Sequence, residues 1–313
     1  MDLIPTTGPH LHVLLNHFPS VGTVIALGLF LTSYHLKSDD LRRSSLVLFL
    51  LLGLLAIPTY ISGAAAKWAI QGNAGISVDV ISAHQDAALL AFIFLGITGC
   101  LAWLALWQER RFTRTPEWNL IAVLGGAIIS LIQMTRTGNI GGHINHPELG
   151  AIEIETVQGE GLTAAVENAI TGVIWAWPAM EAAHFIGMAL IFGVVLLVSL
   201  RAFGVAKNLP YGALHRLLPL GALGLLVNIV TGFFFFIADS GRYVAMDGFP
   251  PKMIFLMIGG VAIIYFTIFD DVWALKAGDD ASPLAKIMAA VTIASWAGVL
   301  IFGRLLPYYG DGG

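Results

Sequence analysis

The sequence predicts an all-α integral membrane protein with eight transmembrane helices, arranged as two parallel four-helix repeats with both termini outside. Hydrophobic residues make up 57% of the 313 residues and charged residues only 12%, against about 25% charged in soluble domains. Apolar segments of about 20 residues, the length of helix that crosses the hydrocarbon core, recur between short polar segments. This composition gives no support to nucleic-acid binding. The single cysteine, Cys100, excludes an internal disulfide and a cysteine-based metal cluster.

Eight segments are long and apolar enough to span a bilayer. We expect them at roughly 13–34, 45–66, 83–107, 118–137, 179–203, 217–238, 253–274 and 285–303. The lipid bilayer is therefore the first expected partner.

The distribution of Lys and Arg between the connections predicts the orientation. One set of connections holds eleven of the sixteen basic residues: Lys37, Arg42, Arg43, Arg110, Arg111, Arg114, Arg201, Lys207, Arg216, Lys276 and Lys286. The positive-inside rule makes this set cytoplasmic and both termini external.

An internal repeat predicts two halves of the same topology. The sequence around His17 resembles that around His184 at an offset of 167, Ile61-Ser62-Gly63 matches Val230-Thr231-Gly232 at 169, and Arg136 matches Arg304 at 168. The predicted parts are a first bundle at 1–137, an external acidic loop at 138–178 and a second bundle at 179–313. Four spans return the chain to its starting side, so the repeats are parallel. At the offset of 168, Lys252 takes the place of His84.

The loop at 138–178 is the longest connection. It begins with a predicted glycine-rich turn, T-G-N-I-G-G, and carries five glutamates: Glu148, Glu153, Glu155, Glu160 and Glu167. Residues 163–175 have the pattern of a short amphipathic helix. Loops of this length commonly bind partners.

Seven of the nine histidines fall at or near the outer face, and only His35 and His215 lie on the cytoplasmic side. Ionisable residues within spans are costly to bury and are therefore functional candidates. His17 and His84 lie at matching depth on two parallel helices, as a haem between them would require. The alternative is that His17 caps its helix and His84 rests in the headgroup zone.

Two further histidines, His143 and His146, follow the predicted glycine-rich turn. With His17 and His84 they would suit Zn or Cu, which favour imidazole, and His146 is also a candidate haem ligand. The alternative is a surface turn whose polar side chains bond their own backbone.

In the second half, Glu181 and His184 share one helical face, and the repeat places Lys252 near them. These three residues could form a quinol or proton site, and His184 could instead bind a second haem. The alternative is an ion pair between Glu181 and Lys252 that fixes helix packing.

The motifs also carry a resemblance. The first half, with H-F-P and T-G-N-I-G-G, resembles an uncharacterised family of four-helix bacterial membrane proteins. The second half, with E-A-A-H-F-I-G-M, N-I-V-T-G and P-K-M, resembles another such family. Both are similar in outline to four-helix b-type cytochromes and to copper-resistance membrane proteins of the CopD kind. Four-helix dihaem proteins have histidines at both membrane faces, and this sequence does not.

The leading hypothesis is a b-type cytochrome-like subunit of an electron-transfer complex in the bacterial inner membrane. Haem b, or alternatively Cu or Zn, would lie near the periplasmic face and exchange electrons with quinol or a periplasmic cytochrome. Any enzymatic role would be that of a redox subunit in a larger oxidoreductase, beside other membrane subunits. Two rival hypotheses are a cofactor-free membrane anchor or accessory subunit, and a metal-binding or metal-transport membrane protein.

Overall fold

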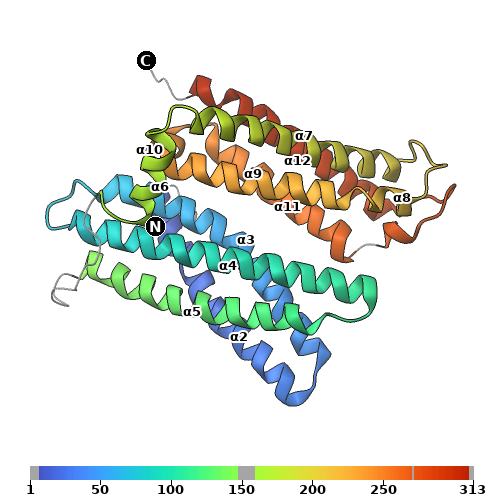
Figure 1. Ribbon diagram of the computed structural model, residues 1–313, viewed down its shortest axis with the longest axis horizontal. Coiled ribbons are helices and arrows are strands. Elements are labelled where there is room, and N and C mark those ends of the chain that lie inside the picture. Colours follow the sequence, from blue (N-terminus) through green and yellow to red (C-terminus); the bar gives the residue numbers. More distant parts are fainter. Residues whose placement is uncertain (1–6, 147–158, 270, 310–313) are drawn as a thin grey trace. The chain divides into compact units, whose positions relative to one another are not determined.

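The computed structural model describes residues 7–146, 159–269 and 271–309, and these residues form helices and no strand (Figure 1). Eight helical segments are long and apolar enough to cross a membrane, which confirms the eight predicted spans. Most begin or end a few residues away from the predicted limits, because the helices continue beyond their apolar windows.

The first part of the chain contains six helices. They are α1 (Gly8–Leu15), α2 (His17–Leu36), α3 (Asp39–Ile70), α4 (Val78–Phe112), α5 (Glu117–Asn145) and α6 (Leu162–Thr171). The short helix α6 agrees with the amphipathic helix expected at 163–175. Residues 147–158, with Glu148, Glu153 and Glu155 of the predicted acidic loop, lie outside the described residues.

The second part contains four membrane-length segments and several short elements. They are α7 (Ala176–Ala202), α8 (Tyr211–His215), α9 (Leu218–Ala238), α10 (Ser240–Ala245), α11 (Phe249–Ile264) with the π-helical turn η2 (Tyr265–Phe269), the 3₁₀ turn η3 (Val272–Ala274) and α12 (Pro283–Tyr309). The chain separates into two compact units, Met1–Ala165 and Val166–Gly313.

Polar caps explain the early helix starts. Thr7 accepts a hydrogen bond from the His10 N–H and is followed by Gly8 and Pro9, so the first helix begins at Gly8 and not near residue 13. Ser38 and Ser77 cap α3 and α4 in the same way. His12 and His84 therefore lie inside helices, although the spans expected from the sequence begin at 13 and 83.

The first span is interrupted at Asn16, where α1 ends and α2 begins. Pro19 has no N–H to donate to the carbonyl of Leu15, four residues earlier, and a missing bond of this kind kinks a helix. His12 and His17 thus belong to two different helical segments.

The predicted glycine-rich turn after the fourth span is helical. Helix α5 continues through it to Asn145, and the backbone N–H of His146 closes the helix on the carbonyl of Gly142 at 3.0 Å. The turn prediction was wrong: Gly141 makes room for the His84 ring within the helix, whereas Gly138 and Gly142 have no atom within 4 Å of an added methyl group.

The first unit is a closed four-helix bundle. Helix α3 packs against α2 and α4, and α5 packs against α4 and α2. The crossing of α3 and α4 lies at Gly53 and Gly99, where a methyl group added to Gly99 would stand 3.1 Å from the Gly53 Cα. Phe30 and Phe49 fill the core and are fully buried.

The second unit packs in a different pattern. Helix α7 packs against α9 and α12, and α11 packs against α12, whereas α9 and α11 do not form a packed pair among the described residues. The closest crossing is between α7 and α9, where a methyl group added to Gly224 would stand 2.7 Å from the Gly187 carbonyl oxygen. At one end, Phe236 and Phe249 stack at 5.7 Å between ring centroids.

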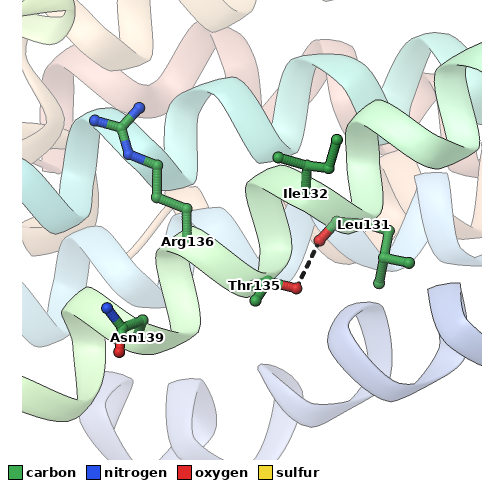
Figure 2. Close-up of a pocket in the computed structure, with 5 residues that line it drawn as sticks. All are labelled: Leu131, Ile132, Thr135, Arg136 and Asn139. Atoms are coloured by element: carbon green, nitrogen blue, oxygen red, sulfur yellow. Dashed lines mark hydrogen bonds between the residues drawn. The ribbon is translucent and has the colours of Figure 1, made fainter.

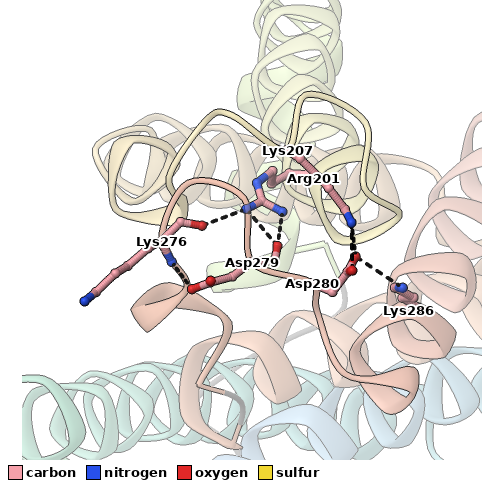
Figure 3. Close-up of polar contacts among 6 residues, drawn as sticks. All are labelled: Arg201, Lys207, Lys276, Asp279, Asp280 and Lys286. Carbon is pink, nitrogen blue, oxygen red and sulfur yellow. Dashed lines mark hydrogen bonds and ion pairs between the residues drawn. The ribbon is translucent and has the colours of Figure 1, made fainter.

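The side chain of Arg201 links two loops of the second unit by hydrogen bonds (Figure 3). It is almost fully buried, donates to the carbonyl oxygens of Leu209, Lys276 and Asp279, and lies over the Tyr211 ring. Nearby, the Lys207 ammonium donates to the exposed Asp280 carboxylate at 2.7 Å, which lowers the pKa of that carboxyl group. The cluster ties the loop after α7 to the loop before α12.

Candidate cofactor site

His84 is held in a fixed orientation between α4 and α5. Its Nδ1 lies 3.1 Å from the carbonyl oxygen of Thr137. The ring packs on Gly141, because a methyl group there would stand 2.9 Å from the His84 Cε1. A side chain at position 141 would push the imidazole out of this place.

His12 is held in the same way between α1 and α3. Its Nδ1 lies 3.1 Å from the carbonyl oxygen of Thr59 and 3.3 Å from the Ser62 hydroxyl. A methyl group at Gly63 would stand 3.0 Å from the His12 Cε1. In both cases the carbonyl belongs to a threonine four residues before the glycine on which the imidazole rests.

These contacts fix the tautomer of both rings. A carbonyl oxygen only accepts hydrogen bonds, so Nδ1 carries the proton and donates it, and Nε2 keeps a lone pair. A histidine that binds a metal through one ring nitrogen usually donates the N–H of the other to an acceptor such as a backbone carbonyl oxygen. The two imidazoles also lie in one neighbourhood, since His12 acts electrostatically on His84. The first unit therefore brings together two half-buried imidazoles with available Nε2 atoms.

The residues that follow His84 connect α4 to two other elements. Gln85 accepts a hydrogen bond from the Lys67 ammonium of α3 at 2.7 Å. Asp86 accepts from the backbone N–H groups of Leu162 and Thr163, at 3.1 and 2.9 Å, and so caps the first turn of α6. Helix α6 thus begins close to the end of the bundle that carries His84.

The other histidines predicted for this site are placed differently. His17 is exposed, and its Nδ1 contacts the carbonyl oxygen of Val13 in the preceding turn at 3.0 Å. His146 is exposed at the end of α5. His143 lies in the last turn of α5 with a buried Nδ1 that has no hydrogen-bond partner among the described residues. Within the described chain, no three His, Cys, Asp or Glu side chains form a group that could hold a metal ion.

The second unit holds His184 by a related contact. Its Nδ1 lies 2.7 Å from the Thr231 hydroxyl of α9, and the ring packs beside Gly232, where a methyl group would stand 3.5 Å from Cε1. Lys252 of α11 lies near enough to act on His184 electrostatically and packs beside Gly303 of α12. This neighbourhood of His184 and Lys252 agrees with the sequence-based expectation.

Glu181, the third residue of the predicted quinol site, is exposed at the start of α7. Burial raises the pKa of Tyr243 in α10, and the carboxylates of Asp239 and Glu181 raise it further, which places Glu181 near α10. No ion pair joins Glu181 to Lys252 among the described residues.

A shallow hollow lies on the face of α5 and contains none of the histidines (Figure 2). It is lined by Leu131, Ile132, Thr135, Arg136 and Asn139. Only Arg136 is charged, and we assign no chemistry to this surface.

No family model matches the chain, and neither the curated proteins nor the solved structures include a similar one. The resemblances carried by the motifs therefore stay predictions.

Sequence reasoning missed His12. The signal was present in two places: Thr7, Gly8 and Pro9 mark a helix start that draws His12 into the membrane segment, and a threonine precedes both Gly63 and Gly141 by four residues.

Proposed function

We propose that this protein is a haem b-binding membrane subunit of an electron-transfer complex, in which His12 and His84 would hold the haem iron. The observation that carries the proposal is the shared support of the two imidazoles: each donates Nδ1–H to a threonine carbonyl and rests on a glycine. This support leaves each Nε2 atom with a lone pair, which is available to bind a metal.

The donor set fits haem better than zinc or copper. The porphyrin supplies four nitrogens to the iron of a haem, so one or two imidazoles from the protein are enough to hold it. A structural zinc site needs four protein ligands and a catalytic one needs three, and the described residues offer no such group. Haem supplies one-electron chemistry when bound. The threonine carbonyls orient both rings and raise their basicity as ligands.

We further propose that the termini and the His12–His84 pair lie at the periplasmic side of a bacterial inner membrane. The excess of Lys and Arg in the alternate connections supports this orientation. Electrons would then be exchanged with quinol or with a periplasmic cytochrome, and the acidic segment between the units would dock a partner.

We also propose that the two units are parallel repeats. The support is the pairing of His12 with Ser62 and Gly63 in one unit and of His184 with Thr231 and Gly232 in the other. In this alignment His12, and not His17, is the counterpart of His184. The different packing of α9 and α11 marks where the repeats have diverged.

The test is the haem content of the purified protein and of single variants, measured by the reduced pyridine haemochrome spectrum and by metal analysis. His12→Ala and His84→Ala should each lose the haem, because one axial ligand is removed. His17→Ala should keep it. A wild-type protein without haem but with stoichiometric Cu or Zn would support the metal-binding alternative, and one with neither would support the cofactor-free accessory subunit.

A further inference from the structure

The imidazole of His184 offers a hydrogen-bond acceptor at Nε2, and this follows from the contacts of its other ring nitrogen, Nδ1. The hydroxyl of Thr231 donates its single proton to the carbonyl oxygen of Val227 at 2.6 Å. The same oxygen therefore accepts from His184, so the proton of the imidazole lies on Nδ1, at 2.7 Å from Oγ1. The Nε2 atom of His184 is left with a lone pair.

Lys252 brings a positive charge to the same neighbourhood. It lies in the first turn of α11, within a membrane-length segment, and its ammonium group makes no hydrogen bond or ion pair with any described residue. A charge in this position is costly inside a membrane, and a helix N-terminus disfavours a cation further. An oxygen atom of a ligand would relieve both costs.

An acceptor and a cation in one neighbourhood select a particular ligand group, and the charge of Lys252 does act on His184. A hydroxyl group can donate its proton to the His184 Nε2 while its oxygen accepts from the Lys252 ammonium. A phosphodiester has no proton to give and would meet the imidazole lone pair with its own. An acidic hydroxyl on a membrane-soluble ring satisfies both residues.

We propose that His184 and Lys252 form the head-group site of a membrane quinol. The choice of a quinol, among ring compounds that carry a hydroxyl group, rests on the proposed redox function. It concerns binding alone: the quinol keeps its two hydroxyl protons, and one of them is shared with the His184 Nε2.

The helix packing near His184 and Lys252 differs from that of the first unit. In the first unit α3 and α4 meet at Gly53 and Gly99, whereas their counterparts α9 and α11 are not packed against each other along their lengths. Each residue also packs beside a glycine, Gly232 or Gly303, where a methyl group would stand at ordinary van der Waals distance: 3.5 Å from the His184 Cε1 and 3.8 Å from the Lys252 Nζ.

Lys252 takes the position in the second unit that His84 has in the first, and this difference separates the roles of the two units. His84 in the first unit and Lys252 in the second each lie on the third membrane helix and pack on a glycine of the fourth. Lysine cannot complete a pair of axial imidazoles with His184. The first unit would hold the haem, and the second would hold the quinol.

The experiment measures anaerobic binding of menadiol to the detergent-purified full chain by equilibrium dialysis, beside menadiol dimethyl ether, which has no hydroxyl proton. His184→Ala and Lys252→Met should each weaken menadiol binding about tenfold or more, the cost of a hydrogen bond to a charged or strongly polar group. Lys252→Arg should keep the affinity, because it keeps the cation. Lys276→Met, which removes an exposed lysine of the same unit, is the matched control.

Equal binding of the dimethyl ether, or unchanged affinity in His184→Ala and Lys252→Met, would overturn the quinol site. The haem content of the same samples separates this inference from the proposed function. Haem without menadiol binding would remove the quinol site only, and menadiol binding without haem would remove the haem proposal only. His184→Gln, which keeps an acceptor, guards against a folding defect and should retain part of the affinity.

Discussion

The imidazoles of His12, His84 and His184 each rest beside a glycine and donate Nδ1–H to an oxygen atom of a neighbouring helix. Two of the three, His84 and His184, were predicted from the sequence because they lie in apolar segments. His12 was missed because the first helix was expected to begin after it. Which nitrogen carries the proton follows from contacts between helices, and no sequence pattern reports these.

Alanine variants of the three glycines beside these imidazoles form a matched series. Gly63→Ala and Gly141→Ala place a methyl group 3.0 and 2.9 Å from an imidazole carbon, so both should displace the histidine and reduce haem content severalfold. Gly232→Ala leaves 3.5 Å, an ordinary van der Waals distance, and should leave the haem unchanged. Haem-to-protein ratios of the three variants measure this, and equal ratios would contradict the role of the glycines.

Arg201 is the second residue whose removal has a defined cost. Arg201→Met removes the buried guanidinium that donates to the carbonyl oxygens of Leu209, Lys276 and Asp279, and a hydrogen bond to a charged group contributes about 1.5–3 kcal/mol. We expect a clear fall in the midpoint of thermal unfolding in detergent. Lys207→Met, which removes an exposed ion pair, should change the midpoint little. Similar midpoints for both variants would show that the buried network contributes nothing.

At the scale of elements, the eight spans follow from length and hydropathy, and their ends follow from caps. Apolar windows locate a span but not its limits, since α3, α4 and α5 all extend into polar sequence. The helical course of Thr137 to Asn145 was not predicted. Glycines are typical of turns in water, but they allow close helix packing in a membrane protein, and His84 occupies the space at Gly141.

The contact between Asp86 and α6 gives a prediction at this scale. Asp86→Ala removes the acceptor for the N–H groups of Leu162 and Thr163, and loss of such a cap costs about 1 kcal/mol. Amide hydrogen exchange across Leu162–Thr171 should therefore accelerate about fivefold. Asp40→Ala, at an exposed position in the first turn of α3, is the control. Unchanged exchange in Asp86→Ala would mean that other contacts hold α6.

For the whole molecule, the sequence predicts the class of protein and the number of spans, and the structure agrees with both. The division after Ala165 was not predicted: it falls within α6, and the sequence assigned that segment to the connecting loop at 138–178. The side of the membrane on which each connection lies stays a prediction. It depends on the charges of the connections, and the packing of the helices does not report it.

Cysteine labelling tests the orientation. In a Cys100→Ser background, Glu160→Cys should react with an impermeant maleimide in intact spheroplasts, because we expect it outside. Arg114→Cys, in a connection expected to be cytoplasmic, should react only after lysis. Both positions are exposed, so accessibility alone does not distinguish them. The reverse pattern would invert the topology and place the histidine pair at the cytoplasmic face.

The electron paramagnetic resonance spectrum of the oxidised purified protein tests whether His12 and His84 together bind one haem iron. Two imidazole ligands produce a low-spin ferric haem, so the account predicts a low-spin signal that His84→Ala and His12→Ala abolish or convert to high spin, while His17→Ala retains it. A wild-type spectrum that contains only high-spin haem, or a low-spin signal that survives both His12→Ala and His84→Ala, would contradict the account.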